Sequence, residues 1–180
     1  MATTKHTLVA IVQDKPGVLN RVVSLFRRRG FNIDSIAVGH SEVPHLSRVT
    51  IIVNGTTATV EQVRKQMDKL IDVVKIFDIT GEKSNSRELA LVKVKATSTT
   101  RSDIIEIADI FRANIVDVAS ESLTIEVTGD EDKIESMLKL LHGFGIKEIA
   151  RTGRVAMVRG NIGAMPVEEK PARSRAKKQG

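Results

Sequence analysis

The chain contains no cysteine, tryptophan or tyrosine, and it has only five phenylalanines among 180 residues. Without cysteine it can form no disulfide, no thiolate metal site and no thiol nucleophile, which fits a reducing cytoplasm. Proteins that stack nucleic-acid bases usually need exposed aromatic side chains. Aromatic residues make up 3% of this chain, so we expect no nucleic-acid partner.

Long apolar runs are also missing. No run approaches the ~20 residues that a membrane-spanning helix requires. Residues 1–6 lead directly into a predicted strand and lack the apolar region of a signal peptide. We therefore expect a soluble, cytoplasmic protein without a membrane partner. The 41% hydrophobic content is enough for a real core, in one large domain or two small ones.

Half of the formal net charge of +6 lies in residues 161–180, and the other +3 is spread over about 160 residues. Residues 161–180 contain five Lys or Arg (Lys170, Arg173, Arg175, Lys177 and Lys178) and two Glu (Glu168 and Glu169). A segment rich in Pro, Lys, Arg and Ser is typical of a solvated, disordered end, and a nucleic-acid-binding arm is the alternative. We interpret residues 161–180 as a basic disordered tail.

Hydrophobic periodicity predicts a βαββαβ unit in the first half of the chain. Gly30 is suited to end the first helix, and Thr59–Gln62 matches a capping box at the start of the second helix. The predicted elements are a strand over Thr7–Val12, a helix over Val18–Arg29, strands over Ile33–Gly39 and Ser47–Val53, a helix from Thr59, and a strand over Val73–Ile79.

The second half repeats this order. Val49–Gly55 is similar to Leu123–Gly129, and Phe26–Arg27 is echoed by Phe111–Arg112. The predicted elements are strands over Glu88–Ala96, Ile115–Ala119, Leu123–Thr128 and Ile146–Arg151, a helix over Arg101–Ala113 and a helix capped by Asp130. The last strand could continue through Val155–Val158.

The repeat predicts an α+β fold of two tandem ferredoxin-like βαββαβ sandwiches. We expect the first domain over residues 5–81, a linker over 82–87 and the second domain over 88–160. An open sheet with helices on one face leaves strand edges exposed. Pairing with a second copy would cover such an edge, so we expect at least a dimer; a monomer whose halves cover each other is the alternative.

The segment Asp14–Leu19 carries the most distinctive chemistry. A Pro-Gly turn at a helix N-terminus exposes backbone N–H groups that have no partner inside the helix, which suits a small carboxylate. Gly17 and Val18 lie in the first turn, and Asn32, at the start of the next strand, could approach this loop from a partner chain. Ile33, Val18 and Leu19 could form an apolar wall for an aliphatic side chain. The simpler alternative is an ordinary turn without a ligand.

Other chemistry is sparse. The corresponding loop of the second half, Ser98–Arg101, has neither Pro nor Gly. His40 and His45 lie close together in sequence, but no further metal ligands cluster with them, which favours a solvated loop over a metal site. No phosphate-binding loop and no clustered nucleophile or base is present. The sequence therefore favours a sensor of a small acid over a catalyst.

At this level of detail, residues 7–79 resemble an ACT domain, the ligand-sensing module of amino-acid metabolism. From about Lys5 to Gly160, the chain resembles the family of small regulatory subunits of acetolactate (acetohydroxyacid) synthase. The motifs that carry the resemblance are Asp14, Pro16–Leu19, Leu25–Phe26, Arg28–Ile33, Leu46–Ile51, Gln66, Lys69–Leu70, Val73, Arg87–Glu88, Leu91–Val94, Phe111–Ala113, Ile115–Val118 and Ala150–Gly153.

The resemblance implies a non-catalytic subunit that activates a separate large catalytic subunit. That partner would join two pyruvates, or pyruvate and 2-oxobutyrate, with thiamine diphosphate, Mg and FAD as its own cofactors; none is expected in this chain. The resemblance also implies feedback inhibition by valine or another branched-chain amino acid between paired ACT domains. By family position, the effector contacts are Asp14, Gly17, Val18, Leu19, Asn32 and Ile33.

One position departs from the family pattern, because Asp14 stands where the family usually has Asn. An ionised Asp14 would repel an effector carboxylate or attract an ammonium group, depending on which end it faces.

Two other functions are alternatives. A stand-alone amino-acid-sensing regulator of transcription would need a helix-turn-helix, for which no segment is left outside the two repeats. An independent enzyme would need a catalytic cluster that the sequence lacks.

Overall fold

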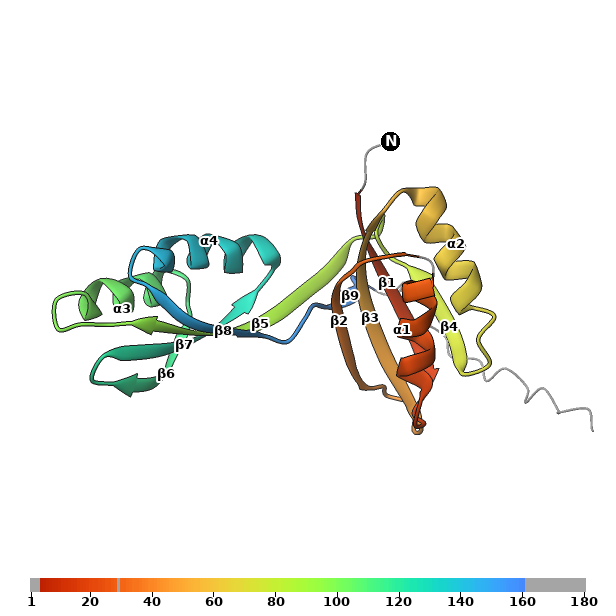
Figure 1. The fold of residues 1–180 in the computed structure, drawn as a ribbon, viewed down its shortest axis with the longest axis horizontal. Helices are drawn as coiled ribbons and strands as arrows, with labels where there is room; N and C mark the ends of the chain where they lie inside the picture. The colour runs from red at the N-terminus through yellow and green to blue at the C-terminus, as the bar shows by residue number, and fades with distance from the viewer. Residues whose placement is uncertain (1–3, 29, 161–180) are drawn as a thin grey trace, which may run out of the picture. The chain divides into compact units, whose positions relative to one another are not determined.

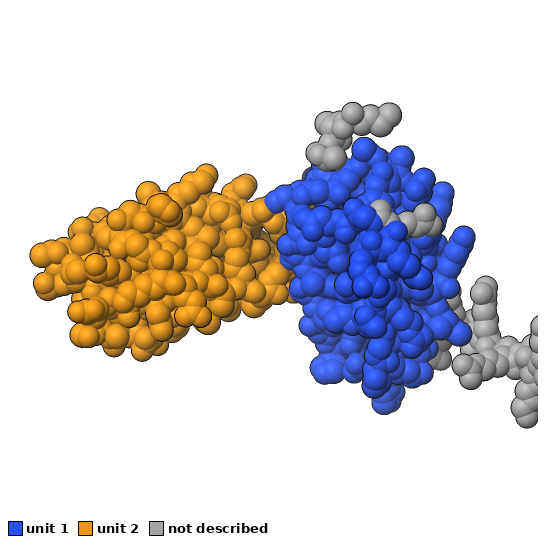
Figure 2. All heavy atoms as spheres, in the orientation of Figure 1, with its two compact units in different colours: residues 1–83, 158–180 blue, residues 84–157 orange. Residues whose placement is uncertain are grey.

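The computed structural model describes residues 4–28 and 30–160 (Figure 1). The chain divides into two compact units, unit 1 with residues 1–83 and 158–180, and unit 2 with residues 84–157 (Figure 2). The predicted tail, 161–180, lies outside the described residues, as does Arg29, the last residue of the first predicted helix. Within the described part of the chain, no helix has the length and apolar character needed to cross a membrane.

Unit 1 has the predicted βαββαβ order. Its elements are β1 (Thr4–Gln13), α1 (Val18–Arg28), β2 (Ile33–His40), β3 (Leu46–Gly55), α2 (Thr57–Met67) and β4 (Val73–Asp78). The four strands form an antiparallel sheet in the order β2-β3-β1-β4.

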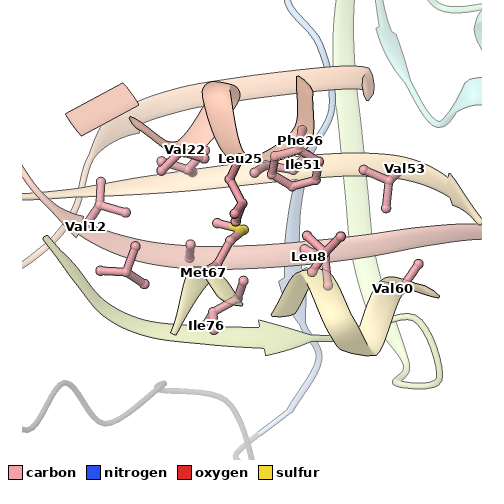
Figure 3. Close-up of a cluster of buried hydrophobic side chains, with 14 of the residues drawn as sticks. Leu8, Val12, Val22, Leu25, Phe26, Ile51, Val53, Val60, Met67 and Ile76 are labelled. Atoms are coloured by element: carbon pink, nitrogen blue, oxygen red, sulfur yellow. The ribbon is translucent and has the colours of Figure 1, made fainter. Parts of the chain in front are cut away.

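The core of unit 1 lies between this sheet and its two helices (Figure 3). Leu8, Ala10 and Val12 of β1 project into it at period two, as expected for side chains on one face of a strand. From α1, the predicted inner-face residues Val22 and Phe26 are buried against them. Met67, near the end of α2, is also fully buried.

Unit 2 repeats the arrangement with a fifth strand. Its elements are β5 (Ser84–Lys95), α3 (Arg101–Ile110), β6 (Asn114–Ala119), β7 (Ser122–Gly129), α4 (Glu131–His142), β8 (Ile146–Arg151) and β9 (Val155–Val158). The strand order is β6-β7-β5-β8, and β9 also pairs with β5. The predicted fold, two tandem ferredoxin-like sandwiches, is therefore confirmed.

The hydrogen bonds that follow the first helix of each unit show which residues of the two units are equivalent. After α1, Gly30 has φ +69° and Phe31 N–H donates to Phe26 O at 3.1 Å. After α3, Arg112 has φ +50° and Ala113 N–H donates to Ala108 O at 2.8 Å. Phe26 is thus the structural counterpart of Ala108. The proposed match of Phe26–Arg27 with Phe111–Arg112 was wrong by three residues.

Two element boundaries also differ from prediction. The N-cap of α2 is Thr56, whose hydroxyl accepts from Thr59 N–H, so the capping box placed at Thr59 was wrong. In the expected linker over 82–87, Ser84–Arg87 are part of β5. Pairing of β5 with β9, a contact between segments far apart in sequence, gives these residues a sheet environment that local composition does not reveal.

Candidate functional site

The connection between β1 and α1 is held from two sides. Gln13 N–H donates to Asp72 O at 2.8 Å, which ties the end of β1 to the segment before β4. Asp14 N–H donates to His45 O at 2.9 Å, which ties the loop to the connection between β2 and β3. These two bonds fix the place where α1 begins.

Gly17 makes the turn onto α1. Its φ of +84° lies in the left-handed region, which a residue with a Cβ adopts only with strain. Its carbonyl accepts from Arg21 N–H at 3.1 Å, so Gly17 is the residue from which the helix starts. A Cβ built on Gly17 would meet only the Arg21 Nη2 atom, at 4.0 Å, which leaves the front of the loop open.

At the N-terminus of α1, some of the backbone N–H groups that were expected to be free are free, and one is not. Val18 N–H donates to Lys15 O at 3.3 Å and is already occupied. For the N–H groups of Gly17, Leu19 and Asn20, the described residues provide no hydrogen-bond acceptor. The first turn of α1 also carries no acidic side chain. The positive end of the helix dipole is therefore available to an anion.

The predicted site side chains differ in accessibility. Val18 is 3% exposed and packs in the core, so its side chain cannot form the apolar wall that was expected of it. Leu19 is 44% exposed, and Asn32 is also exposed, directly before β2. Ile33 is half-buried against the core. Leu19, Asn32 and Ile33 remain the candidates for side-chain contacts with a ligand.

Asp14 lies at the outer side of the loop. Its half-exposed carboxylate has Oδ2 3.3 Å from Nδ1 of His40, at the end of β2. His45 contributes its backbone carbonyl to this region. Among residues 4–28 and 30–160, no group of three or more His, Cys, Asp or Glu side chains is arranged to hold a metal.

An ion pair behind the loop was missed from the sequence. Arg21 Nη1 lies 2.6 Å from Oδ2 of Asp72, which is buried. The pair links the first turns of α1 to the segment between α2 and β4. Since the two residues lie far apart in sequence and follow no shared motif, only the fold brings them together.

In the equivalent loop of unit 2, threonine side chains form hydrogen bonds within the loop. Thr97 N–H donates to the Thr100 hydroxyl at 3.0 Å, and the Thr97 hydroxyl lies 2.9 Å from that of Thr99. Asp103 places a carboxylate in the first turn of α3. An anion at the N-terminus of α3 would be repelled by Asp103, whereas the first turn of α1 has no acidic side chain.

Apolar side chains are exposed on the side of unit 1 where β2 ends the sheet. Leu19 and Val23 are four residues apart and so share one face of α1, and Val38 is exposed on β2 itself. Because β2 is an edge strand, its outer backbone groups are unpaired within the sheet. This side of unit 1 has the features of a self-association surface.

Comparisons with known proteins match nearly the whole chain. Residues 8–75 match a family model described as an AHAS small subunit-like ACT domain, and residues 87–160 match one described as the small subunit of acetolactate synthase. A probable acetolactate synthase small subunit of Archaeoglobus fulgidus is 56% identical over 157 residues, covering 87% of this chain and 98% of that one.

Two further relatives agree. The acetolactate synthase small subunit of Mycobacterium bovis is 52% identical over 163 residues, 91% of this chain and 97% of the relative. The crystal structure of the acetolactate synthase small subunit from Thermotoga maritima has a TM-score of 0.81 and 44% identity, and the match covers 88% of this chain and 99% of that one.

Proposed function

The chain belongs to the acetolactate synthase small-subunit family, and we propose that it activates the large catalytic subunit and makes it sensitive to inhibition by valine. Membership supports a regulatory, non-catalytic subunit with a large catalytic partner. Thiamine diphosphate, Mg and FAD would belong to that partner. Within unit 1 we assign effector contacts to Asp14, Gly17, Val18, Leu19, Asn32 and Ile33.

The observation that carries the effector assignment is the open N-terminus of α1. Free N–H groups of Gly17, Leu19 and Asn20 suit the carboxylate of an amino acid. Leu19 and Ile33 offer apolar surface to a branched side chain. Val18 contributes only by its place in the turn, because its N–H is bonded to Lys15 O and its side chain belongs to the core.

Asp14 is suited to the other end of the ligand. A carboxylate beside the loop attracts an α-ammonium group and disfavours an α-carboxylate. We therefore assign the ammonium group to Asp14 and the carboxylate to the start of α1. Charge-assisted hydrogen bonds of about 1.5–3 kcal/mol each, reduced by binding entropy, suit a sensor of a metabolite near ~0.1 mM.

Two copies of unit 1 would complete the site. Pairing along β2 would cover the exposed Leu19, Val23 and Val38 and give the edge strand a partner. Asn32 of one protomer could then approach the loop of the other. Valine bound there would favour one arrangement of the pair, and it would inhibit to the extent that its affinity differs between arrangements.

The test is a Gly17→Asp variant mixed with the catalytic subunit. The added side chain occupies the front of the loop, adds a negative charge and must adopt a positive φ. We expect activation of acetolactate formation to be retained and valine inhibition to be lost. Gly145→Asp is the matched control, because Gly145 also has positive φ, +93°, but lies in unit 2. Undiminished valine inhibition of Gly17→Asp would rule out the site, and absence of activation by the wild-type chain would rule out the function.

A further inference from the structure

The guanidinium of Arg21 lies between the buried carboxylate of Asp72 and the open front of the loop that carries Gly17. Its Nη1 is 2.6 Å from Oδ2 of Asp72, and its Nη2 is 4.0 Å from the position that a Cβ on Gly17 would take. Arg21 is one turn after Gly17, and the side chains of a helix lean toward its N-terminus. The start of α1 therefore combines free N–H groups with a cation.

Asp72 fixes the position of this cation. Asp72 is 8% exposed, and its backbone carbonyl accepts from Gln13 N–H at the end of β1. Its Oδ2 accepts no well-aligned hydrogen bond from the described residues, despite the short distance to Arg21. The charge of Arg21 thus stabilises a carboxylate that is nine-tenths buried, and separating the two groups would be costly.

Most N–H donors of Arg21 are unused. A guanidinium carries five N–H donors in a planar fork that matches a carboxylate. Among residues 4–28 and 30–160, Asp72 is the one group paired with the Arg21 side chain, which is 52% exposed. Nη2 is therefore free to donate to a ligand in front of Gly17.

The counterpart of Asp72 in unit 2 is a glycine. In unit 1, Gln13 N–H, at the end of β1, donates to Asp72 O at 2.8 Å. In unit 2, Lys95 N–H, at the end of β5, donates to Gly145 O at 2.9 Å. The same backbone bond therefore joins the equivalent segments of unit 2 without a carboxylate.

The counterpart of Arg21 in unit 2 is an acid. Arg21 is five residues before Phe26. Asp103 is five residues before Ala108, the counterpart of Phe26, so Asp103 of α3 stands where α1 has Arg21. Unit 2 thus packs its first helix on its sheet without this ion pair. The pair belongs to the unit whose first helix starts with free N–H groups and no acid.

We propose that Arg21 binds the carboxylate of the effector together with the free N–H groups at the start of α1, and that Asp72 is its positioning residue. The assignment rests on the effector site proposed for unit 1. A hydrogen bond from a guanidinium to a carboxylate is stronger than one between neutral groups. Arg21 therefore makes the site select ligands that carry an α-carboxylate, while Asp14 remains the partner of the ammonium group.

The test measures inhibition of the complex with the catalytic subunit by valine and by valinol, which has a hydroxymethyl group in place of the carboxylate. Arg21→Gln alone would leave a buried charge unpaired, so the variant combines it with Asp72→Asn and removes both charges. Loss of one charge-assisted hydrogen bond should raise the valine concentration for half-inhibition about 10- to 100-fold. The valinol concentration should change little, so the preference for valine over valinol should fall by a similar factor.

Two single changes serve as comparisons. Arg27→Gln removes a positive charge from the last turn of α1 and should leave valine inhibition unchanged. Arg21→Lys keeps the charge but loses the planar fork. It should therefore raise the half-inhibiting valine concentration by less than the double change does.

Three outcomes overturn the assignment of Arg21. If valine inhibits the double variant at wild-type concentrations while Gly17→Asp is insensitive, the site exists without Arg21. If inhibition by valine and by valinol weakens equally, the pair only holds the loop in shape. If Gly17→Asp is itself still inhibited by valine, the effector site of unit 1 is wrong, and the role of Arg21 is wrong with it.

Discussion

The first strand of each unit leads into its first helix through a short loop, and the two loops differ in how they treat the helix end. In unit 1, Asp14–Gly17 leave the start of α1 with free N–H groups and no acid in the first turn. In unit 2, Thr97–Thr100 bond to one another, and Asp103 occupies the first turn of α3. The start of α1 thus has free donors and no carboxylate beside them in the helix, whereas the first turn of α3 carries the carboxylate of Asp103.

Outside these loops the two units start and end their helices in the same way. The second helix of each starts after a glycine, with Thr56 as N-cap in unit 1 and Asp130 in unit 2. A residue with positive φ, Gly30 or Arg112, follows the end of each first helix. The comparison indicates that helix caps and apolar periodicity define the scaffold, while a few loop residues decide whether it can bind a ligand.

The largest difference that mutation should reveal is in the cores. Phe26 is fully buried in unit 1, whereas Phe111 of unit 2 is half-buried at the end of α3. Phe26→Ala should lower the free energy of unfolding of unit 1 by about 3–5 kcal/mol, because it leaves a large cavity. Phe111→Ala should have a clearly smaller effect on unit 2.

The measurement is urea unfolding followed by circular dichroism and by amide signals of each unit, since the chain has no Trp or Tyr for fluorescence. Each variant should shift the transition of its own unit. Equal losses for both variants would mean that burial does not distinguish these two positions.

A second difference lies at equivalent ends of β1 and β5. In unit 2 the buried Glu88 accepts from Arg151 Nε at 3.0 Å, and Glu135 also accepts from Arg151, at 2.7 Å. Burial alone would lower the pKa of Arg151, but the hydrogen bonds to Glu88 and Glu135 outweigh it and raise the pKa. Glu88→Gln should therefore destabilise unit 2 by about 1–3 kcal/mol.

The register places Asp78 of unit 1 where unit 2 has Arg151. Asp78 Oδ2 lies 3.4 Å from His6 Nδ1, a longer contact at a more exposed carboxylate. Asp78→Asn should then destabilise unit 1 by less than Glu88→Gln destabilises unit 2 in the same urea experiment. The reverse order would show that the buried carboxylate is not the stronger anchor.

Much of the scaffold could be predicted from the sequence because its signals are local. The inner-face residues of α1, including Val22 and Phe26, follow the helical period, and Asp130 caps α4 as predicted. The start of β5 could not be predicted in this way, because Ser84–Arg87 are in a strand through pairing with the distant β9. Thr59 shows the limit of a motif: Thr56, three residues earlier, is the cap.

The candidate site divides in the same manner. The position of the loop and the role of Gly17 could be predicted, because a Pro-Gly turn precedes an apolar helix. That Val18 uses its N–H on Lys15 O, and that its side chain is buried, depends on how the helix sits on the sheet. The Arg21–Asp72 pair depends on the packing of α1 beside the segment that follows α2. Such contacts follow no periodicity or fixed spacing in the sequence, so they could not be predicted from it.

A third, smaller difference concerns the residue after each first helix. Arg112 has φ +50°, a conformation that glycine adopts without strain, as Gly30 does in unit 1. Arg112→Gly should stabilise unit 2 by about 0.5–1 kcal/mol or leave it unchanged. Arg27→Gly, inside α1, should destabilise unit 1 by a similar amount. Thermal unfolding by circular dichroism would show the two opposite shifts, and a loss of stability in both would remove the role assigned to the positive φ.

The smallest difference is between Glu61 of α2 and its counterpart Glu135 of α4, five residues after the N-cap in each unit. Glu135 pairs with Arg151 of another strand, whereas Glu61 pairs with Arg64 of its own helix, at 2.7 Å. The hydrogen bond from Arg64 lowers the pKa of Glu61 from 4.5 to about 2. A lowered pKa means that the pair contributes to stability above pH 4.5 and that this contribution is lost as the pH falls toward 2. Because Glu61 is exposed and salt screens such a pair, the change should be clearest in an NMR titration of its carboxyl carbon. Arg64→Gln should return the pKa toward 4.5, and an unchanged pKa would show that Arg64 is not its cause.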